Sequence, residues 1–192
     1  MKKIKTLFVR VFDGKHKPIV TEEIEAGCEW VLNGEGKATR KYDGTCCLIK
    51  DGEIYKRYDF KPGRKLPVGA IPCQEAADEF TGHFPHWVKC DPNNPADKWH
   101  IQAFVKRVNV EDGTYELVGE HFQSNIDGVV QSGDVLVRHG ATVLDVERTF
   151  EGIKNYLRDN EIEGIVFHRE NGEMCKIKRS DFGFNWIKKG VS

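Results

Sequence analysis

Apolar and polar residues alternate along much of the chain, which is the period-two pattern of strands with one buried face. The clearest stretches are residues 3–12, 114–122 and 134–139. Asp13-Gly14 follows the first of them and has the residue types of a tight turn. The pattern therefore predicts a protein built largely of β-strands.

Two longer stretches predict strand–turn–strand units. Residues 37–50 read as a strand interrupted at Asp43-Gly44, and a hairpin turn at Asp51-Gly52 joins it to a second strand over 53–60. Residues 163–179 form a second such unit, with Asn171-Gly172 as its turn. Asp-Gly and Asn-Gly are favoured in tight hairpins because the central residues of these turns take positive φ angles.

Helical spacing occurs in two places. The stretch 146–160 predicts an amphipathic helix, whose apolar positions are Val146, Phe150, Ile153 and Leu157. A second helix can begin near Asp97 and run through 97–108, with the Asp97 carboxylate as its cap. Because antiparallel strands outnumber helices, we expect an α+β fold.

Residues 61–97 are rich in proline and glycine and show no sustained pattern. The segment PHWVKCDPNNPADKWH at 85–100 is the least regular part of the chain. We therefore expect a long loop here, lying over the functional site.

The chain has 192 residues, of which 39% are apolar and 31% charged, as in ordinary soluble globular proteins. This length suits a single domain covering residues 1–192. No apolar run approaches the roughly 18 residues that cross a bilayer, and the opening MKKIKTLFVRVFDG reads as a strand, not a signal peptide. We expect a cytoplasmic protein without a membrane partner.

The formal net charge of −1 excludes a uniformly basic nucleic-acid-coating protein but leaves room for a local basic groove. Six cysteines occur without a CxxC pair, so we expect free thiols. Cys73, His83, His86 and Cys90 carry zinc-ligand side chains, but their irregular spacing does not favour a zinc site.

The usual phosphate-binding sequences are missing. GEGKAT at 34–39 lacks the spacing of a P-loop, and no GxGxxG occurs. Strand alternation instead puts Lys176 and Lys178 on one face of their strand, and Lys41 and Asp43 on one face of theirs. Lysines near carboxylates suit a metal-bound polyphosphate.

Four short motifs then follow in order: KYDG at 41–44, YELVG at 115–119, EGIV at 163–166 and KIK at 176–178. This set resembles the covalent nucleotidyltransferase superfamily of DNA ligases, RNA ligases and mRNA capping enzymes, whose first motif is KxDG. From about residue 36 to 187 the chain is most similar to the small ATP-dependent 5′-3′ RNA ligases, enzymes of RNA repair. The resemblance implies a ligase adenylation domain, with antiparallel sheets flanking a nucleotide groove.

The resemblance also implies the chemistry. Lys41 would attack the α-phosphate of ATP, with Mg2+ or Mn2+, to form lysyl-AMP. The AMP would pass to an RNA 5′-phosphate, which is then joined to a 3′-hydroxyl. Attack needs the neutral amine, and nearby cations favour that form over the ammonium.

Each remaining site residue has an implied role. Glu163 would bind the metal, and Asp43 and Gly44 would shape the turn after Lys41. Arg57, Lys176 and Lys178 would contact phosphates or the RNA end. Glu116 and Glu120 both match the third-motif glutamate that meets the ribose, and Glu116 is favoured because it directly follows an aromatic residue.

Only 14 residues (192 − 178) follow Lys178, so we expect no OB-fold domain of the kind found in DNA ligases and capping enzymes. Two alternatives stay open: a nucleotidyltransferase that uses GTP without ligation, and a non-catalytic RNA- or nucleotide-binding module. The intact Lys41 disfavours the module. No aromatic residue stands out for stacking on adenine.

Overall fold

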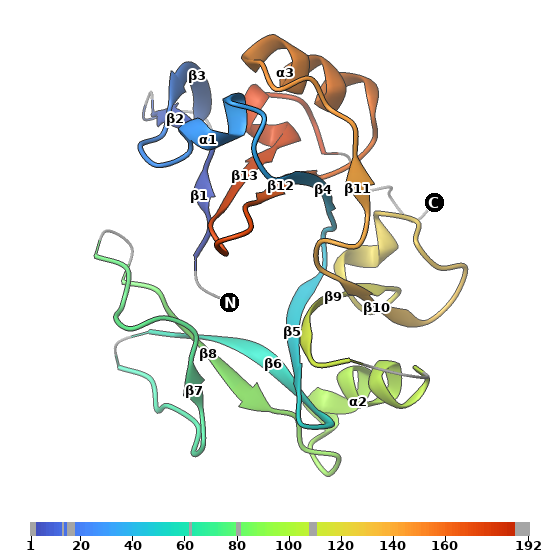
Figure 1. The fold of residues 1–192 in the computed structure, drawn as a ribbon. Coiled ribbons are helices and arrows are strands. Elements are labelled where there is room, and N and C mark those ends of the chain that lie inside the picture. Colours follow the sequence, from blue (N-terminus) through green and yellow to red (C-terminus); the bar gives the residue numbers. More distant parts are fainter. Residues whose placement is uncertain are drawn as a thin grey trace. The chain divides into compact units, whose positions relative to one another are not determined.

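The computed structural model describes residues 3–12, 14, 18–61, 63–79, 82–107 and 111–186. This part of the chain forms two compact units (Figure 1). Unit 1 holds Lys3 and the segment Asp43–His139, and unit 2 holds Ile4–Tyr42 and the segment from Gly140 onward. The chain therefore passes between the units after Lys3, after Tyr42 and again after His139.

Unit 2 contains a five-stranded sheet in the order β1-β13-β12-β4-β11. Its strands are β1 (Lys5–Thr6), β4 (Lys37–Lys41), β11 (Val143–Leu144), β12 (Gly164–His168) and β13 (Met174–Lys178). All neighbours are antiparallel except β1 and β13, which are parallel. The central strand β12 places Gly164 opposite both Lys41 and Lys178. This register brings the ends of three motif-bearing strands together.

The remaining elements of unit 2 build its core. They are the antiparallel pair β2 (Phe8–Val11) and β3 (Ile19–Ile24), the helices α1 (Glu29–Leu32) and α3 (Phe150–Asp159), and the 3-10 turn η3 (Arg179–Phe182). The helix α3 confirms the amphipathic prediction, because Ile153 and Leu157 are fully buried. Its first turn is capped by Thr149, whose Oγ1 accepts a hydrogen bond from Gly152 N at 3.0 Å. The strand expected at 3–12 is split into β1 and β2, and Asp13 of the expected turn lies outside the described residues.

A disulfide joins Cys28 to Cys175 inside unit 2, with a Cα–Cα distance of 6.2 Å. The expectation of free thiols is therefore wrong for this pair. Cys46, Cys47, Cys73 and Cys90 are free. The sequence did not predict this pairing, because 147 residues separate the two cysteines and only the folded unit brings them together.

Unit 1 contains a six-stranded antiparallel sheet in the order β10-β9-β5-β6-β8-β7. Its strands are β5 (Thr45–Lys50), β6 (Glu53–Phe60), β7 (Ile71–Pro72), β8 (Phe84–Lys89), β9 (Gly113–Gly119) and β10 (Asp134–Arg138). The 3-10 turns η1 (Pro95–Asp97) and η2 (Gln123–Asn125) and the helix α2 (Lys98–Val105) complete the unit. The predicted hairpin between β5 and β6 is confirmed, with positive φ angles of 53° at Asp51 and 73° at Gly52.

The expectation of a long loop over 61–97 is wrong in its second half. The strand β8 pairs with β6 from Tyr55 opposite Lys89 to Phe60 opposite Phe84. Pro85 and its two successors are buried one after another, so this strand shows no alternation in the sequence.

The cap expected from Asp97 is also absent. Helix α2 begins at Lys98, but the Asp97 side chain makes no capping hydrogen bond. Its buried carboxylate instead pairs with Lys56 and accepts a hydrogen bond from Asp91 N at 3.0 Å. Asp97 thus anchors the loop before the helix to strand β6.

The two sheets and few helices give an α+β protein, as expected. In the part of the chain that the structure describes, no helix has the length and apolar character needed to cross a bilayer. The assignment to an adenylation domain, the single-domain description and the missing OB-fold stay predictions.

Candidate functional site

Lys41 and Lys178 meet on one carboxylate in unit 2. Lys41 ends β4, Lys178 ends β13, and Glu163 directly precedes β12 between them. Lys41 Nζ lies 2.5 Å from Glu163 Oε2, and Lys178 Nζ lies 2.7 Å from Glu163 Oε1. We call these three residues, with Lys176, the Lys41 cluster.

Burial makes this arrangement electrostatically demanding. The Glu163 side chain is only 6% exposed, against 22% for Lys41 and 33% for Lys178. A buried carboxylate must be paired to avoid a large desolvation cost, and two ammonium groups supply that pairing here. Because one carboxylate faces two lysines, the cluster carries an excess of positive charge.

Lys176 adds a further cation to the same cluster. Burial, together with the charges of Lys178, Lys41 and Arg10, lowers the pKa of Lys176 to about 8, although Glu163 opposes the shift. This lysine therefore loses its proton near pH 8 instead of well above it. A bound anion would relieve the repulsion among these side chains.

The end of β13 is held by Asp181, which the sequence analysis did not single out. Asp181 Oδ2 accepts a hydrogen bond from Lys178 N at 2.8 Å, and Oδ1 pairs with Arg10 Nη2 at 2.7 Å. Asp181 is buried, so its carboxylate fixes the backbone that carries Lys178. The only sequence signal is its place just after the KIKR stretch.

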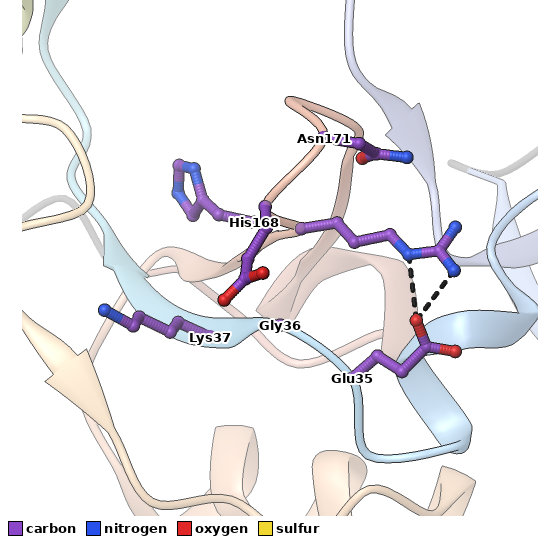
Figure 2. A pocket seen from close by; sticks show the side chains of 7 residues that line it. Glu35, Gly36, Lys37, His168 and Asn171 are labelled. Carbon is purple, nitrogen blue, oxygen red and sulfur yellow. Dashed lines mark hydrogen bonds and ion pairs between the residues drawn. The ribbon is translucent and has the colours of Figure 1, made fainter.

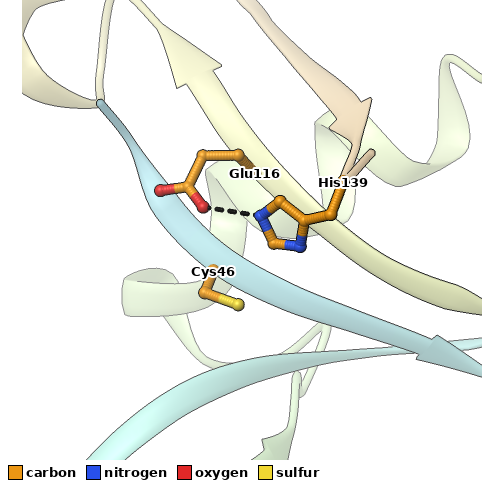
Figure 3. Close-up of side chains that lie close together, drawn as sticks. All are labelled: Cys46, Glu116 and His139. Atoms are coloured by element: carbon orange, nitrogen blue, oxygen red, sulfur yellow. Dashed lines mark hydrogen bonds and ion pairs between the residues drawn. The ribbon is translucent and has the colours of Figure 1, made fainter. Parts of the chain in front are cut away.

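In unit 1, Glu116 organises a second group of residues, which we call the Glu116 cluster. Glu116 on β9 lies opposite Cys46 on β5. Its Oε1 accepts a hydrogen bond from Gly44 N at 3.2 Å, and its Oε2 accepts one from His139 Nε2 at 2.9 Å (Figure 3). Glu116 therefore links Gly44, near the start of the unit 1 segment Asp43–His139, to His139 at its end.

The turn of the KYDG motif is held by two carboxylates. Asp127 Oδ2 accepts a hydrogen bond from Asp43 N at 2.7 Å, next to the bond from Gly44 N to Glu116. A Cβ at Gly44 would lie 2.2 Å from Leu117 O, so only glycine fits there. Asp127 and His139 were missed because they lie far along the chain from the turn, outside the four motifs.

Arg57 lies on the same face of the unit 1 sheet as Glu116. Cys47 lies opposite Lys56, so the next residues, Cys46 and Arg57, have their side chains together on the opposite face of the sheet. Glu116 lies opposite Cys46 and shares that face. The charge of Arg57 acts on the Cys46 thiol, although burial and Glu116 together raise the pKa of that thiol to about 12. Arg57 Nε also pairs with Asp59 at 3.1 Å.

The predicted site residues thus fall into two groups. Lys41, Glu163, Lys176 and Lys178 come together in unit 2, and Gly44, Glu116 and Arg57 come together in unit 1 beside the backbone of Asp43. Glu120 is exposed just after β9, where its backbone N–H donates to Gly133 O at 3.0 Å.

Three sets of side chains could bind a metal ion, and one of them is Cys90, Asp97 and His100, whose donor atoms lie within 4.8 Å of one another. Glu163 offers carboxylate oxygens, which Mg2+ and Mn2+ prefer, but a metal would have to displace a lysine from it. Cys46, Glu116 and His139 bring their donor atoms within 4.8 Å of one another (Figure 3). Cys73, His83, His86 and Cys90 do not gather into one such set in the described residues.

A separate hollow lies at the far end of the β4–β12 pair from Lys41, where Lys37 is opposite His168 (Figure 2). Arg169 lines it and is paired with Glu35 at 2.7 Å and with Glu173 at 2.8 Å. Because these carboxylates neutralise the arginine, we interpret the hollow as a structural ion-pair network.

No protein-family model matches the chain. Curated proteins named RNA ligase 1 are similar to it over most of its length. The protein from Pongo abelii is 26% identical over 223 aligned positions, which cover 77% of this chain and 67% of that protein. The protein from Rattus norvegicus is 24% identical over 250 positions (90% and 76%), and that from Danio rerio is 26% identical over 222 (78% and 68%). These similarities support a relationship to RNA ligases.

Proposed function

We propose that the chain is an ATP-dependent RNA ligase that acts through a covalent lysyl-AMP at Lys41. The observation that carries the proposal is the Lys41 cluster, in which two lysines at the ends of the strands on either side of β12 share the buried Glu163. The similarity to proteins named RNA ligase 1 also supports RNA ligation as the function.

The proposed reaction has three steps. The Lys41 Nζ lone pair attacks the α-phosphorus of ATP, a nitrogen–phosphorus bond forms, pyrophosphate leaves and the amine proton goes to solvent. An oxygen of the RNA 5′-phosphate then attacks the same phosphorus and releases Lys41, which leaves AMP on the RNA. Finally the 3′-hydroxyl of an RNA end attacks the 5′-phosphate and gives its proton to solvent, the phosphodiester forms and AMP leaves.

Glu163 has two tasks in this proposal. Its ion pair keeps the Lys41 side chain oriented before nucleotide arrives. It is also the carboxylate that would hold Mg2+ or Mn2+, and such an ion would supply positive charge to the phosphates.

Lys176 and Lys178 would hold the phosphates in this scheme. The lowered pKa of Lys176 means that part of its population is neutral at mildly alkaline pH. A phosphate beside it favours the ammonium form, so nucleotide binding should take up a proton near pH 8. Proton uptake of this kind supports an anion site and is measurable by calorimetry in buffers of different ionisation enthalpy.

In unit 1, Glu116 and the backbone of Asp43 and Gly44 would position the turn that follows Lys41. Glu116, or the exposed Glu120, would meet the ribose, and Arg57 would contact the RNA 5′-phosphate. The expected partners are ATP and RNA with 5′-phosphate and 3′-hydroxyl ends, in the cytoplasm.

The deciding experiment is intact mass after incubation with ATP and Mg2+, beside GTP and beside Lys41→Ala. We expect a gain of about 329 Da from ATP, the mass of one adenylyl group on the nucleophile, and no gain in the variant. A gain from GTP alone would indicate guanylyl transfer. No adduct with either nucleotide, after pretreatment with pyrophosphate, would leave only a binding module.

A further inference from the structure

We propose that an unpaired RNA strand binds along the exposed face of α2. This inference rests on the proposed ligase function and names the surface that would hold its RNA substrate. The face borders a groove of about 640 Å3 in unit 1, which the loop from Pro92 to Pro95 closes on the other side. None of the residues predicted for the nucleotide site lines this groove.

The groove has the charge that a polyanion needs. Its nine lining residues include Lys98 and Lys106 and no carboxylate, although the chain holds 30 acidic residues. Among the described residues neither lysine forms an ion pair, whereas Lys56 in the same unit is bound to Asp97. Two exposed lysines without carboxylate partners are available to phosphates.

The floor of the groove is apolar. Lys98, Ile101, Gln102 and Val105 follow one another at helical spacing on a single face of α2. Val105 is 74% exposed, which is a high value for a large aliphatic side chain on a helix. A duplex offers mainly its phosphates to such a surface, whereas an unpaired strand can also lay bases and riboses against the aliphatic floor.

Aromatic rings extend this surface beside Lys98. The rings of Trp99 and His121 are stacked with centroids 3.4 Å apart and an interplanar angle of 14°. Lys98 Nζ lies 4.3 Å from the Trp99 ring centroid, and the exposed His121 is fixed by Asp134 at 2.7 Å. Because His121 and Lys98 both lie over the Trp99 ring, the exposed His121 is the ring on which a base of a single strand would stack.

An acidic peptide would share the charge of RNA but fits the groove less well. The side-chain amides of Asn93 and Gln102 on its wall both donate and accept hydrogen bonds, as the edges of unpaired bases do. The carboxylates of an acidic peptide only accept hydrogen bonds. The observations therefore favour RNA.

The test measures binding of a short 5′-phosphorylated single-stranded RNA by fluorescence anisotropy as salt is varied. The Lys98→Ala/Lys106→Ala variant should bind about tenfold or more weakly at low salt. The slope of log K against log salt should become shallower by about 1.4, because each lost phosphate contact removes about 0.7. Lys89→Ala/Lys154→Ala removes the same charge from two other exposed sites and should change neither quantity.

Other probes separate the possible occupants. Val105→Asp should weaken binding of the single strand while leaving the fold intact, since Val105 is exposed. Unchanged affinity in the double variant would overturn the proposal. Equal binding of the matching duplex, or equal competition by a polyglutamate peptide, would also overturn it.

The lysyl-AMP assay distinguishes this proposal from the function on which it rests. The Lys98→Ala/Lys106→Ala variant should form lysyl-AMP from ATP as the unaltered protein does, and lose only RNA affinity and sealing. If the unaltered protein binds RNA through the groove but forms no adduct, the proposed function fails and the groove stands. If adduct forms and the variant keeps its RNA affinity, the groove alone fails.

Discussion

At the scale of single residues, Glu163 decides the electrostatics of the Lys41 cluster. Both of its oxygens are paired, and its side chain is buried more completely than either lysine. Removing the carboxylate charge leaves the neighbouring ammonium groups facing one another in a half-buried site. Stability and chemistry should therefore both depend on this residue.

Glu163→Gln should lower lysyl-AMP formation by at least about 100-fold, because Lys41 loses its orienting partner and the phosphates lose the proposed metal ligand. It should also destabilise the fold by about 1–3 kcal/mol, less than for a fully buried pair because both lysines reach solvent. Intact mass and urea unfolding measure the two effects. Glu161→Gln, at an exposed position just before it, should change neither.

Lys176 makes a separate prediction about pH. Its folded pKa of about 8 lies below the ordinary value of 10.5, so at pH 7 the folded chain carries the cost of a charged lysine in a partly buried site. Between these values the unfolded chain binds a proton that the folded chain has lost, so stability rises with pH. Lys176→Met, which has no proton, should be more stable than the unaltered protein at pH 7 by at most about 3 kcal/mol.

That advantage should shrink as the pH rises through 8 and vanish above 10.5. Urea unfolding of both proteins at each pH isolates the lysine, because other titrating groups affect them equally. A stability difference independent of pH would mean that methionine simply packs better, and would contradict the charge argument.

At the scale of elements, the strands and turns differ in how far the sequence foretells them. The β5–β6 and β12–β13 hairpins were predictable because Asp-Gly and Asn-Gly specify their turns locally. Strand β8 was not, because its run of buried residues includes a proline and lacks alternation. Propensity is local, whereas pairing with β6 is decided by the whole sheet.

The residues of the candidate site also differ in whether the sequence predicts them. Lys41, Glu163 and Lys178 were found because each ends or begins a strand with a recognisable motif. Asp127 and His139 were not, since they reach Asp43 and Glu116 from 84 and 23 residues away. Contacts of this kind depend on the folded register, which no local pattern encodes.

Gly44→Ala tests the turn that these contacts hold. The added Cβ would lie 2.2 Å from Leu117 O and 2.7 Å from Val118 Cγ1, so β5 and β9 would have to part. We expect destabilisation of about 1–3 kcal/mol and loss of lysyl-AMP formation, measured by thermal unfolding and intact mass. Gly69→Ala, in open space at a positive φ of 75°, should cost about 1–2 kcal/mol from backbone strain and leave adduct formation unchanged.

At the scale of the whole molecule, the chain builds two units with separate cores and crosses between them three times. Chain order alone did not reveal this division, because unit 1 combines Lys3 with the segment Asp43–His139, which separates the two segments of unit 2. The sequence predicted the β12–β13 hairpin but did not indicate that β1 pairs with β13 in parallel in the same sheet.

The disulfide in unit 2 supplies a test at this scale. Cys28 and Cys175 are both buried and close a loop of 147 residues, so opening the bond should cost about 2–5 kcal/mol. A reducing cytoplasm would open it, so the comparison is between oxidised and dithiothreitol-treated protein. Backbone amide hydrogen exchange should become faster in α3, β12 and β13, because these elements contribute to the hydrophobic core that contains the disulfide. The Cys28→Ala/Cys175→Ala variant should not respond to dithiothreitol, and faster exchange confined to β5, β6 and β8 would contradict the assignment of the bond to unit 2.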